Sequence, residues 1–444
     1  MTEPFPQEEL SRIGLEAARA AWQGGMTVRK PDGSVVPIPL VAEPEIVSDA
    51  VLAEAAREAR RILSGAVKLA RALLEDGDAR DREALLGPFE GLEKQAMEQL
   101  FAAPCPAVVA RVDWLLPAEG GPPRALELNA TIPAMPGYAD LAAHSWLRAA
   151  ARARGRTPRE ANALVAACGS HMENLRRALV AFHRLRGGDR ARPSIALVAR
   201  PGDAQVGELA RLAEHFRQMG HAARQLTPAE CIPEEWDVLY RHVWAHNTDP
   251  ATPFARALRE PARFALANPV NGLLEAKGLF ARLSECADDP RLARAAGLDA
   301  EEKAAAARLP FTRRLDARLV GRVVDERERW VLKRSWDYGG KSVHLGAETE
   351  PTAWAAVVRE AVADQRGGGF VVQERIFAAR RPATRVAPGV ETRGALYRDL
   401  STYTGLLDDA PTGSVVRAAA SPVVNILGGG GLAPLVPESV YAQL

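Results

Sequence analysis

Lysine is scarce in this chain of 444 residues, whereas arginine is abundant. Basic residues number 57, and only seven of them are lysines: Lys30, Lys68, Lys94, Lys277, Lys303, Lys333 and Lys341. A GC-rich coding sequence would produce the same bias, so the bias alone indicates no function. Arginine cannot replace lysine where a site needs a compact ammonium group. Each remaining lysine is therefore a candidate for a specific role.

Other absences exclude whole classes of protein. No apolar run reaches the roughly 18 residues of a membrane span, and the polar first ten residues do not resemble a signal peptide. The net charge is only +1, with 57 basic and 56 acidic residues, which argues against a dedicated nucleic-acid binder. The four cysteines have neither a CxxC pair nor zinc-ligand spacing. They are typical of reduced thiols, so we expect a cytoplasmic protein without zinc.

The length and the apolar patterns predict several regions. At roughly 150 residues per domain, the chain has room for two to four domains. Apolar residues recur at steps of three or four over 52–73, which predicts a helix, and buried-strand patterns follow at 107–114 and 124–129. We expect a mainly helical region at 1–104, a region with two buried strands at 105–192, and a compact α/β unit with a parallel sheet at 193–260. The final region, 261–444, mixes helices with a strand up to about residue 345 and is rich in strands over its last hundred residues.

Three of the seven lysines lie in two settings that suit a phosphate site. Lys277 follows an apolar segment, and Lys333 ends a predicted strand that precedes a loop with two glycines and Lys341. Glycines let backbone N–H groups approach phosphate oxygens, and a lysine adds a point charge. The loop is neither a Walker A sequence nor a GxGxxG fingerprint. A glycine hairpin with solvated charges is the alternative.

A pair of polar residues on the second predicted strand suits a metal ion. Alternation places Glu127 and Asn129 on the same face of this strand. A carboxylate and an amide oxygen are hard ligands of the kind that bind Mg²⁺ against phosphates. For any single E-x-N the alternative, two solvent-facing residues on an edge strand, is the commoner outcome.

Two later segments complete the set of candidate motifs. A buried strand turns polar at Gln373 and Glu374, where backbone groups could meet an adenine edge. Arg417 precedes the glycine run 428–431 and could stabilise charge on a transferred phosphoryl group. The alternatives are an ordinary strand end and one more surface arginine among fifty.

The order of these motifs resembles the ATP-grasp superfamily in its circularly permuted form, as in eukaryotic-type glutathione synthetase and the glutathionylspermidine-synthetase-like ligases. In permuted members the E-x-N strand precedes the nucleotide lysines, as Glu127 and Asn129 do here. Residues 331–333, followed by Asp337, resemble the family element V-L-K-x-x-x-E-G-G-G. This sequence has Asp337 in place of the glutamate and Tyr338 in place of the first glycine.

The resemblance implies a role for each matching residue. Lys277 and Lys333 would bind the nucleotide phosphates, and Arg417 would act with Lys333 on the phosphoryl group in transfer. The remaining residues fall into three groups: Tyr338, Gly339, Gly340 and Lys341 in a lid over ATP; Gln373, Glu374 and Ile376 at the adenine; and Glu127, Asn129 and Asp337 as ligands of two Mg²⁺.

The resemblance also implies a fold and an activity. The fold would be α/β (α+β), a circularly permuted ATP-grasp with an inserted Rossmann-like substrate lobe and a helical N-terminal region. The activity would be that of an ATP-dependent carboxylate-amine ligase, which forms an acylphosphate, releases ADP and phosphate, and makes an amide on amino-acid- or peptide-like molecules. The alternatives are an ATP-grasp kinase of a small molecule and a non-catalytic nucleotide-binding protein.

Substrate contacts are predicted at two places. Arg200 and Arg241, at strand ends of the α/β unit, could bind a carboxylate in a bidentate manner, although surface arginines are the alternative. Glu391 and Arg393, with Asp399 nearby, lie where they could contact the acceptor, and a salt bridge is the alternative. We expect small-molecule carboxylate and amine substrates, no nucleic acid or membrane partner, and a homodimer by analogy with the family.

Overall fold

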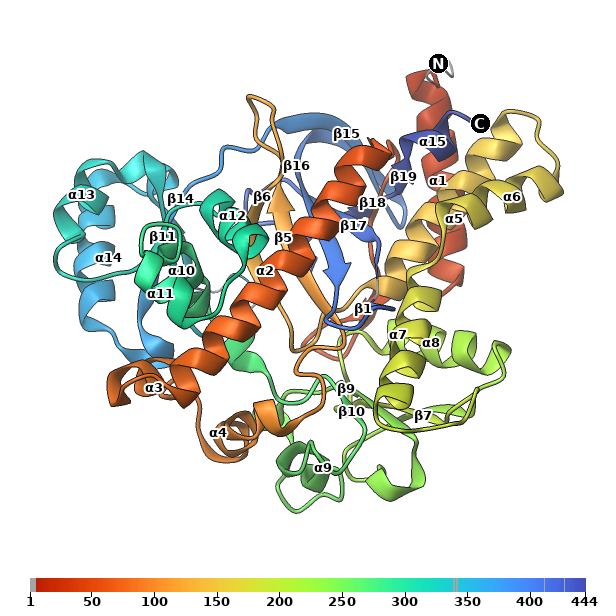
Figure 1. Ribbon diagram of the computed structural model, residues 1–444. Helices are drawn as coiled ribbons and strands as arrows, with labels where there is room; N and C mark the ends of the chain where they lie inside the picture. Colours follow the sequence, from red (N-terminus) through yellow and green to blue (C-terminus); the bar gives the residue numbers. More distant parts are fainter. Residues whose placement is uncertain (1–4, 338–339, 341, 411, 427) are drawn as a thin grey trace.

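The largest sheet joins segments from both ends of the chain (Figure 1). The computed structural model describes residues 5–337, 340, 342–410, 412–426 and 428–444. The sheet has seven strands in the order β15-β3-β18-β17-β16-β5-β6, so β6 lies at an edge. The bounds are Arg380–Ala387 for β15, Leu40–Val41 for β3, Gly431–Ala433 for β18, Ser414–Ala419 for β17, Val390–Thr404 for β16, Ala110–Leu115 for β5 and Arg124–Asn129 for β6.

The pairing of β5 with β6 determines which polar side chains share a face. Arg111 lies opposite Asn129, and Asp113 lies opposite Glu127, in an antiparallel register with an irregularity after Asp113. Residues directly opposite each other on paired strands project from the same face of the sheet. Apolar neighbours such as Leu128 point the other way into the core. One face of this sheet edge therefore carries four charged or polar groups.

A second sheet is antiparallel and has four strands in the order β11-β14-β12-β13. Leu332 and Phe370 pack with Trp354 and Val358 in one buried cluster, which covers one face of the sheet with helices. Side chains alternate along a strand, so Lys333 points away from this cluster. The bounds are Thr312–Arg314 for β11, Phe370–Glu374 for β14, Trp330–Arg334 for β12, Val343–Leu345 for β13, Val320–Asp325 for α13 and Pro351–Ala363 for α14.

The predicted α/β unit is present as a third sheet, whose four strands are all parallel in the order β10-β9-β7-β8. It lies at the bottom of Figure 1. The sheet includes β10, which begins six residues after the predicted end of the region at residue 260. The bounds are Leu266–Ala267 for β10, Val238–His242 for β9, Ile195–Ala199 for β7, Ala223–Leu226 for β8, His171–Leu185 for α7, Val206–Gln218 for α8 and Ala255–Arg259 for α9.

Helices connect the three sheets. The helix predicted over 52–73 is α2 (Asp49–Glu75), which runs diagonally across the view in Figure 1 and contacts β16, α10 and α12. The hydroxyl of Ser48 caps it by accepting the N–H of Val51. The other helices are α1 (Gln7–Gln23), α3 (Ala79–Leu86), α4 (Gly91–Glu98), α5 (Pro136–Ala153), α6 (Pro158–Cys168), α10 (Lys277–Glu285), α11 (Pro290–Ala295), α12 (Ala300–Arg308) and α15 (Glu438–Tyr441).

The first hundred residues also contain short strands, so this region is not helical throughout. They are β1 (Thr27–Arg29), β2 (Val35–Pro37), the β3 strand of the large sheet, and β4 (Glu45–Val47), which pairs with β19 (Leu435–Pro437). The fold is a mixed α/β fold. Within the described part of the chain, none of the helices combines the length and the apolar character that crossing a membrane requires. The predicted division into four regions stays a prediction.

Candidate active site

A cavity of about 390 Å³ lies between the edge of the seven-stranded sheet and the polar face of the four-stranded sheet. We call it the central cavity. Ten of the residues predicted to bind nucleotide or metal, or to act in catalysis, line it: Glu127, Asn129, Lys277, Lys333, Asp337, Gly340, Gln373, Glu374, Ile376 and Arg417. Tyr338, Gly339 and Lys341, predicted for the lid, lie outside the described residues. The structure thus gathers residues that are up to 290 positions apart in the sequence.

The two sheets are joined by hydrogen bonds at the base of the central cavity. The ammonium group of Lys333 donates to Gln373 Oε1 at 2.7 Å and to the backbone oxygen of Leu126 at 3.4 Å. Gln373 Nε2 donates to the same Leu126 oxygen at 3.2 Å and to Thr312 Oγ1 at 3.1 Å. Strand β6 of one sheet is therefore held against β12 and β14 of the other, with Lys333 buried between them.

Lys277 reaches the central cavity from the first position of helix α10. Its ammonium group lies 3.4 Å from Glu127 Oε2 and donates to the backbone oxygen of Asp337 at 3.0 Å. The predicted phosphate lysine therefore touches both predicted metal-binding segments. A site built in this way places a cation and an acid close enough to act on the same polyphosphate.

The charges of the central cavity perturb one another. Burial raises the pKa of Glu127, but Lys277 and Lys333 outweigh that effect, and the pKa is below its usual value. Glu127 is therefore a carboxylate at neutral pH. Burial lowers the pKa of Lys333 to about 8, and Glu127 opposes that fall. An anion bound beside Lys333 would favour its charged form, because an opposite charge stabilises an ammonium group.

Arg417 lies in a buried network of four charged groups. It donates through Nε to Asp399 Oδ2 at 3.0 Å and through Nη2 to Asp113 Oδ2 at 2.8 Å. Arg111 donates to both oxygens of Asp113 at 2.7 and 3.0 Å. Burial would lower the pKa of Arg417, but Asp399 and Asp113 raise it above its ordinary value, so this guanidinium stays charged.

Sequence reasoning missed Arg111 and Asp113, which also line the central cavity. The signal was present, because two opposite charges stand two residues apart in an otherwise apolar strand and must share a face. Asp113 also accepts from Asn129 Nδ2 at 3.1 Å, which leaves the amide oxygen of Asn129 as the atom that can face a cation. The network therefore orients a predicted metal ligand as well as Arg417.

The chemistry of the predicted metal ligands fits a hard cation bound together with phosphates. Glu127 supplies a carboxylate, Asn129 an amide oxygen, and Asp337 a second carboxylate that accepts a hydrogen bond from Ser342. Within the described ranges, no group of three or more His, Cys, Asp or Glu residues could bind a metal by itself. A Mg²⁺ ion here would need Asn129 and oxygens of a bound ligand, as Mg²⁺ commonly does.

The predicted adenine segment lies in the wall of the central cavity, but some of its donors are occupied. The N–H of Glu374 donates to Phe311 at 2.8 Å, and the N–H of Arg375 donates to Arg329 at 2.7 Å. Strand β14 is an inner strand with partners on both sides, so the N–H groups of these two residues cannot face adenine. Ile376, which was also predicted for this segment, and Phe377 line the same wall of the cavity.

Arg241 is buried in the protein and does not line the central cavity. Its side chain is 1% exposed. It donates to the backbone oxygens of Asn268, Val243 and Pro269 at 2.8–2.9 Å. These bonds fasten the end of strand β9 to the chain that follows β10. Arg241 was predicted to bind substrate because a strand end is a common ligand position. In the structure, its N–H donors are instead occupied by hydrogen bonds to backbone oxygens.

The other predicted substrate residues also lie outside the lining of the central cavity. Arg200 is half exposed and lies 3.6 Å from Asp203. Glu391 and Arg393 are exposed near the turn between β15 and β16. Six to eight residues separate them from Asp399 on the same strand, which corresponds to about 20 to 26 Å at the usual strand rise. Asp399 alone of this group lines the cavity.

Replacing Arg241 with lysine should destabilise the protein. We expect Arg241→Lys to lower the free energy of unfolding by about 3 kcal/mol or more, because an ammonium group cannot satisfy three separated carbonyl groups in a buried site. Arg200→Lys is the matched control, and an exposed substitution should change stability by no more than about 0.5 kcal/mol. Urea unfolding measures both. Equal midpoints for the two variants would contradict the structural role of Arg241.

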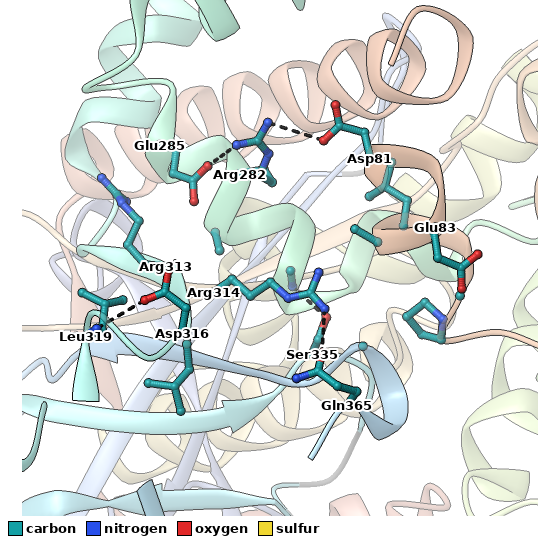
Figure 2. Close-up of a pocket in the computed structure, with 18 of the residues that line it drawn as sticks. Asp81, Glu83, Arg282, Glu285, Arg313, Arg314, Asp316, Leu319, Ser335 and Gln365 are labelled. Carbon is teal, nitrogen blue, oxygen red and sulfur yellow. Dashed lines mark hydrogen bonds and ion pairs between the residues drawn. The ribbon is translucent and has the colours of Figure 1, made fainter. Parts of the chain in front are cut away.

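A second cavity, of about 1170 Å³, lies beside α3, α10 and β11, and we call it the side cavity (Figure 2). The charged side chains that line it largely form ion pairs with one another. Arg282 lies 3.7 Å from Asp81, and Arg318 lies 2.6 Å from Asp316. Ser335 and Gly278 line it, although the residues before them, Arg334 and Lys277, line the central cavity. The two cavities therefore share a wall.

The architecture has a counterpart among solved structures. The chain is similar to a glutathione synthetase-like effector from Globodera pallida in its apo form, with a TM-score of 0.63 and 12% sequence identity, over 98% of each chain. The chain has a glutathione synthetase-like fold. No family model matches the sequence, and no curated protein matches it. The likeness at this identity concerns the fold alone.

Proposed function

We propose that this protein is an ATP-dependent carboxylate-amine ligase with a circularly permuted ATP-grasp architecture. The observation that carries the proposal is the meeting of Lys277, Lys333 and Glu127 in one cavity between two sheets. Two ammonium groups match the charge of a polyphosphate, and the carboxylate matches its cation. The glutathione synthetase-like fold supports this assignment, because the residues meet at the junction of its sheets.

The first step would be phosphoryl transfer from ATP to a substrate carboxylate. This reaction needs positioning and charge neutralisation more than covalent help from the protein. Lys277 and Lys333 would neutralise phosphate oxygens, while Glu127, Asn129 and Asp337 would hold Mg²⁺. A magnesium ion bound by these residues would supply positive charge to the phosphates during the transfer. The product is an acylphosphate, and ADP is released.

Arg417 would stabilise charge on the transferred group. Its bonds to Asp399 and Asp113 use Nε and Nη2, so Nη1 is the donor that can turn toward a phosphoryl oxygen. The two carboxylates hold the guanidinium in place before the reaction begins, which is the arrangement that electrostatic stabilisation requires. An amine would then attack the acyl carbon, and phosphate would leave as the amide forms.

The proposal is tested by an ADP-release screen with pairs of amino acids, short peptides and polyamines, followed by mass spectrometry. We expect ADP release that depends on both a carboxylate and an amine, with a product whose mass is their sum minus one water. A stable phosphorylated product, with no amide from any amine, would instead establish a small-molecule kinase. Absence of ATP binding under all conditions would contradict both.

A further inference from the structure

Ser335 joins the two segments that carry the phosphate lysines. It follows strand β12 directly, two residues after Lys333, and its side chain is 3% exposed. Its hydroxyl oxygen accepts the N–H of Gly278 at 2.9 Å, and its backbone oxygen accepts the N–H of Lys277 at 2.8 Å. One buried residue thus binds the first two N–H groups of helix α10.

Helix α10 depends on Ser335 because the residue at its own N-cap position cannot cap it with a side chain. The first N–H groups of any helix lack partners within it. The N-cap position is Ala276, which makes no side-chain hydrogen bond. Helix α10 also begins with Lys277, and a cation is unfavourable at the positive end of a helix dipole. Ser335 compensates from another element by accepting the two N–H groups.

The position of Ser335 is itself fixed by backbone hydrogen bonds to the glycines that precede strand β14. Its N–H donates to the backbone oxygen of Gly369 at 2.8 Å, and the N–H of Trp336 donates to Gly367 at 2.8 Å. Lys277 then reaches back to the backbone oxygen of Asp337 at 3.0 Å. The start of α10 and the segment after Lys333 are therefore tied at three points.

We propose that Ser335 is a positioning residue, which holds Lys277 at the separation from Lys333 that a bound triphosphate requires. The proposal rests on the proposed function of the central cavity. Ser335 lines the side cavity, where Figure 2 labels it, and it is not among the residues that line the central cavity. It therefore acts on the nucleotide through Lys277 rather than by contact.

The first test removes the hydroxyl group and measures ATP affinity by calorimetry. We expect Ser335→Ala to bind MgATP about tenfold more weakly than the wild-type protein, which is the effect of losing one such hydrogen bond. Thr157→Ala is the control, because the Thr157 hydroxyl also accepts an N–H from the first turn of a helix, here its own helix α6, and Thr157 lies outside the lining of the central cavity. This control should lose thermal stability and keep its ATP affinity.

A second variant disrupts the hydrogen bond between Gly278 and Ser335 by changing Gly278. A Cβ atom at Gly278 would lie 2.8 Å from the Ser335 hydroxyl oxygen, so Gly278→Ala should displace that oxygen and weaken ATP binding to a similar degree. In the Ser335→Ala background this clash is absent, and Gly278→Ala should add little further loss. Additive losses would overturn the assignment of the contact.

A third comparison separates positioning from general stability. In a Lys277→Met background, Ser335→Ala should leave ATP affinity within about twofold, because the residue through which it acts is gone. An undiminished tenfold effect in that background would overturn the proposal. So would wild-type ATP affinity in both Ser335→Ala and Gly278→Ala. If the wild-type protein itself fails to bind ATP, the proposed function fails, and the role of Ser335 with it.

Discussion

Lys333→Met is expected to weaken ATP binding by roughly 100-fold, because it removes a charge-assisted contact in a buried site. Lys333 is buried between the two sheets, where water cannot replace its charge. The fold should persist, since methionine has a similar length and the hydrogen bond from Gln373 to Leu126 still joins the two sheets. Calorimetric titration with MgATP measures the effect.

Lys303→Met is the matched control for this prediction. Lys303 is exposed on helix α12, so the same substitution there should leave ATP affinity unchanged. Unchanged affinity in a folded Lys333→Met protein would remove the phosphate role of Lys333. It would also remove the main reason for placing the triphosphate between the two sheets.

Glu127→Gln is expected to reduce ADP release by roughly 100- to 1000-fold, the usual range for losing one electrostatic contact to a transition state. Glutamine keeps the shape of the side chain but lacks the charge that binds a cation. The loss of the 3.4 Å ion pair with Lys277 also frees that lysine to shift. Asp337→Asn should act in the same direction, because it removes charge from the second predicted ligand segment.

The control is Glu301→Gln, at a glutamate whose side chain is 70% exposed on α12. It should retain wild-type turnover. Circular dichroism and a thermal melt establish that all three variants are folded. Wild-type turnover in both Glu127→Gln and Asp337→Asn would rule out the predicted metal site.

Alternation along one short strand was enough to predict that Glu127 and Asn129 share a face. Leu128 is apolar and lies between Glu127 and Asn129, so burying it turns both polar groups to the other side. The structure places both residues in the lining of the central cavity. Local patterns of this kind can be predicted from the sequence because successive side chains on a strand must point to opposite faces.

Partners distant in sequence could not be predicted in the same way. Arg111 and Asp113 pair with each other, but the bond that joins Asp113 to the rest of the network comes from Arg417, about 300 residues later. Their strand looked like an ordinary buried strand because the residues around them are apolar. The capping of helix α10 by Ser335 could not be predicted for a similar reason. Capping motifs are recognised within one segment of sequence, and Ser335 belongs to a different segment from the helix.

The substrate candidates that lie outside the lining of the central cavity share another cause. Arg241 ends a strand of a parallel sheet, where ligands commonly bind, but nearby backbone oxygens occupy its donors. Glu391 and Arg393 share strand β16 with Asp399, yet the strand is fifteen residues long and carries them away from the cavity. The sequence indicates the strand without indicating how far it extends.

Oxygen transfer from the substrate tests the central claim most directly. The acid identified by the ADP-release screen would be labelled with oxygen-18 in its carboxyl group, and the released phosphate analysed by mass spectrometry. Formation of an acylphosphate predicts one labelled oxygen in each phosphate, because the carboxylate oxygen that attacks phosphorus leaves with it. Amide formation with unlabelled phosphate would contradict the proposed mechanism.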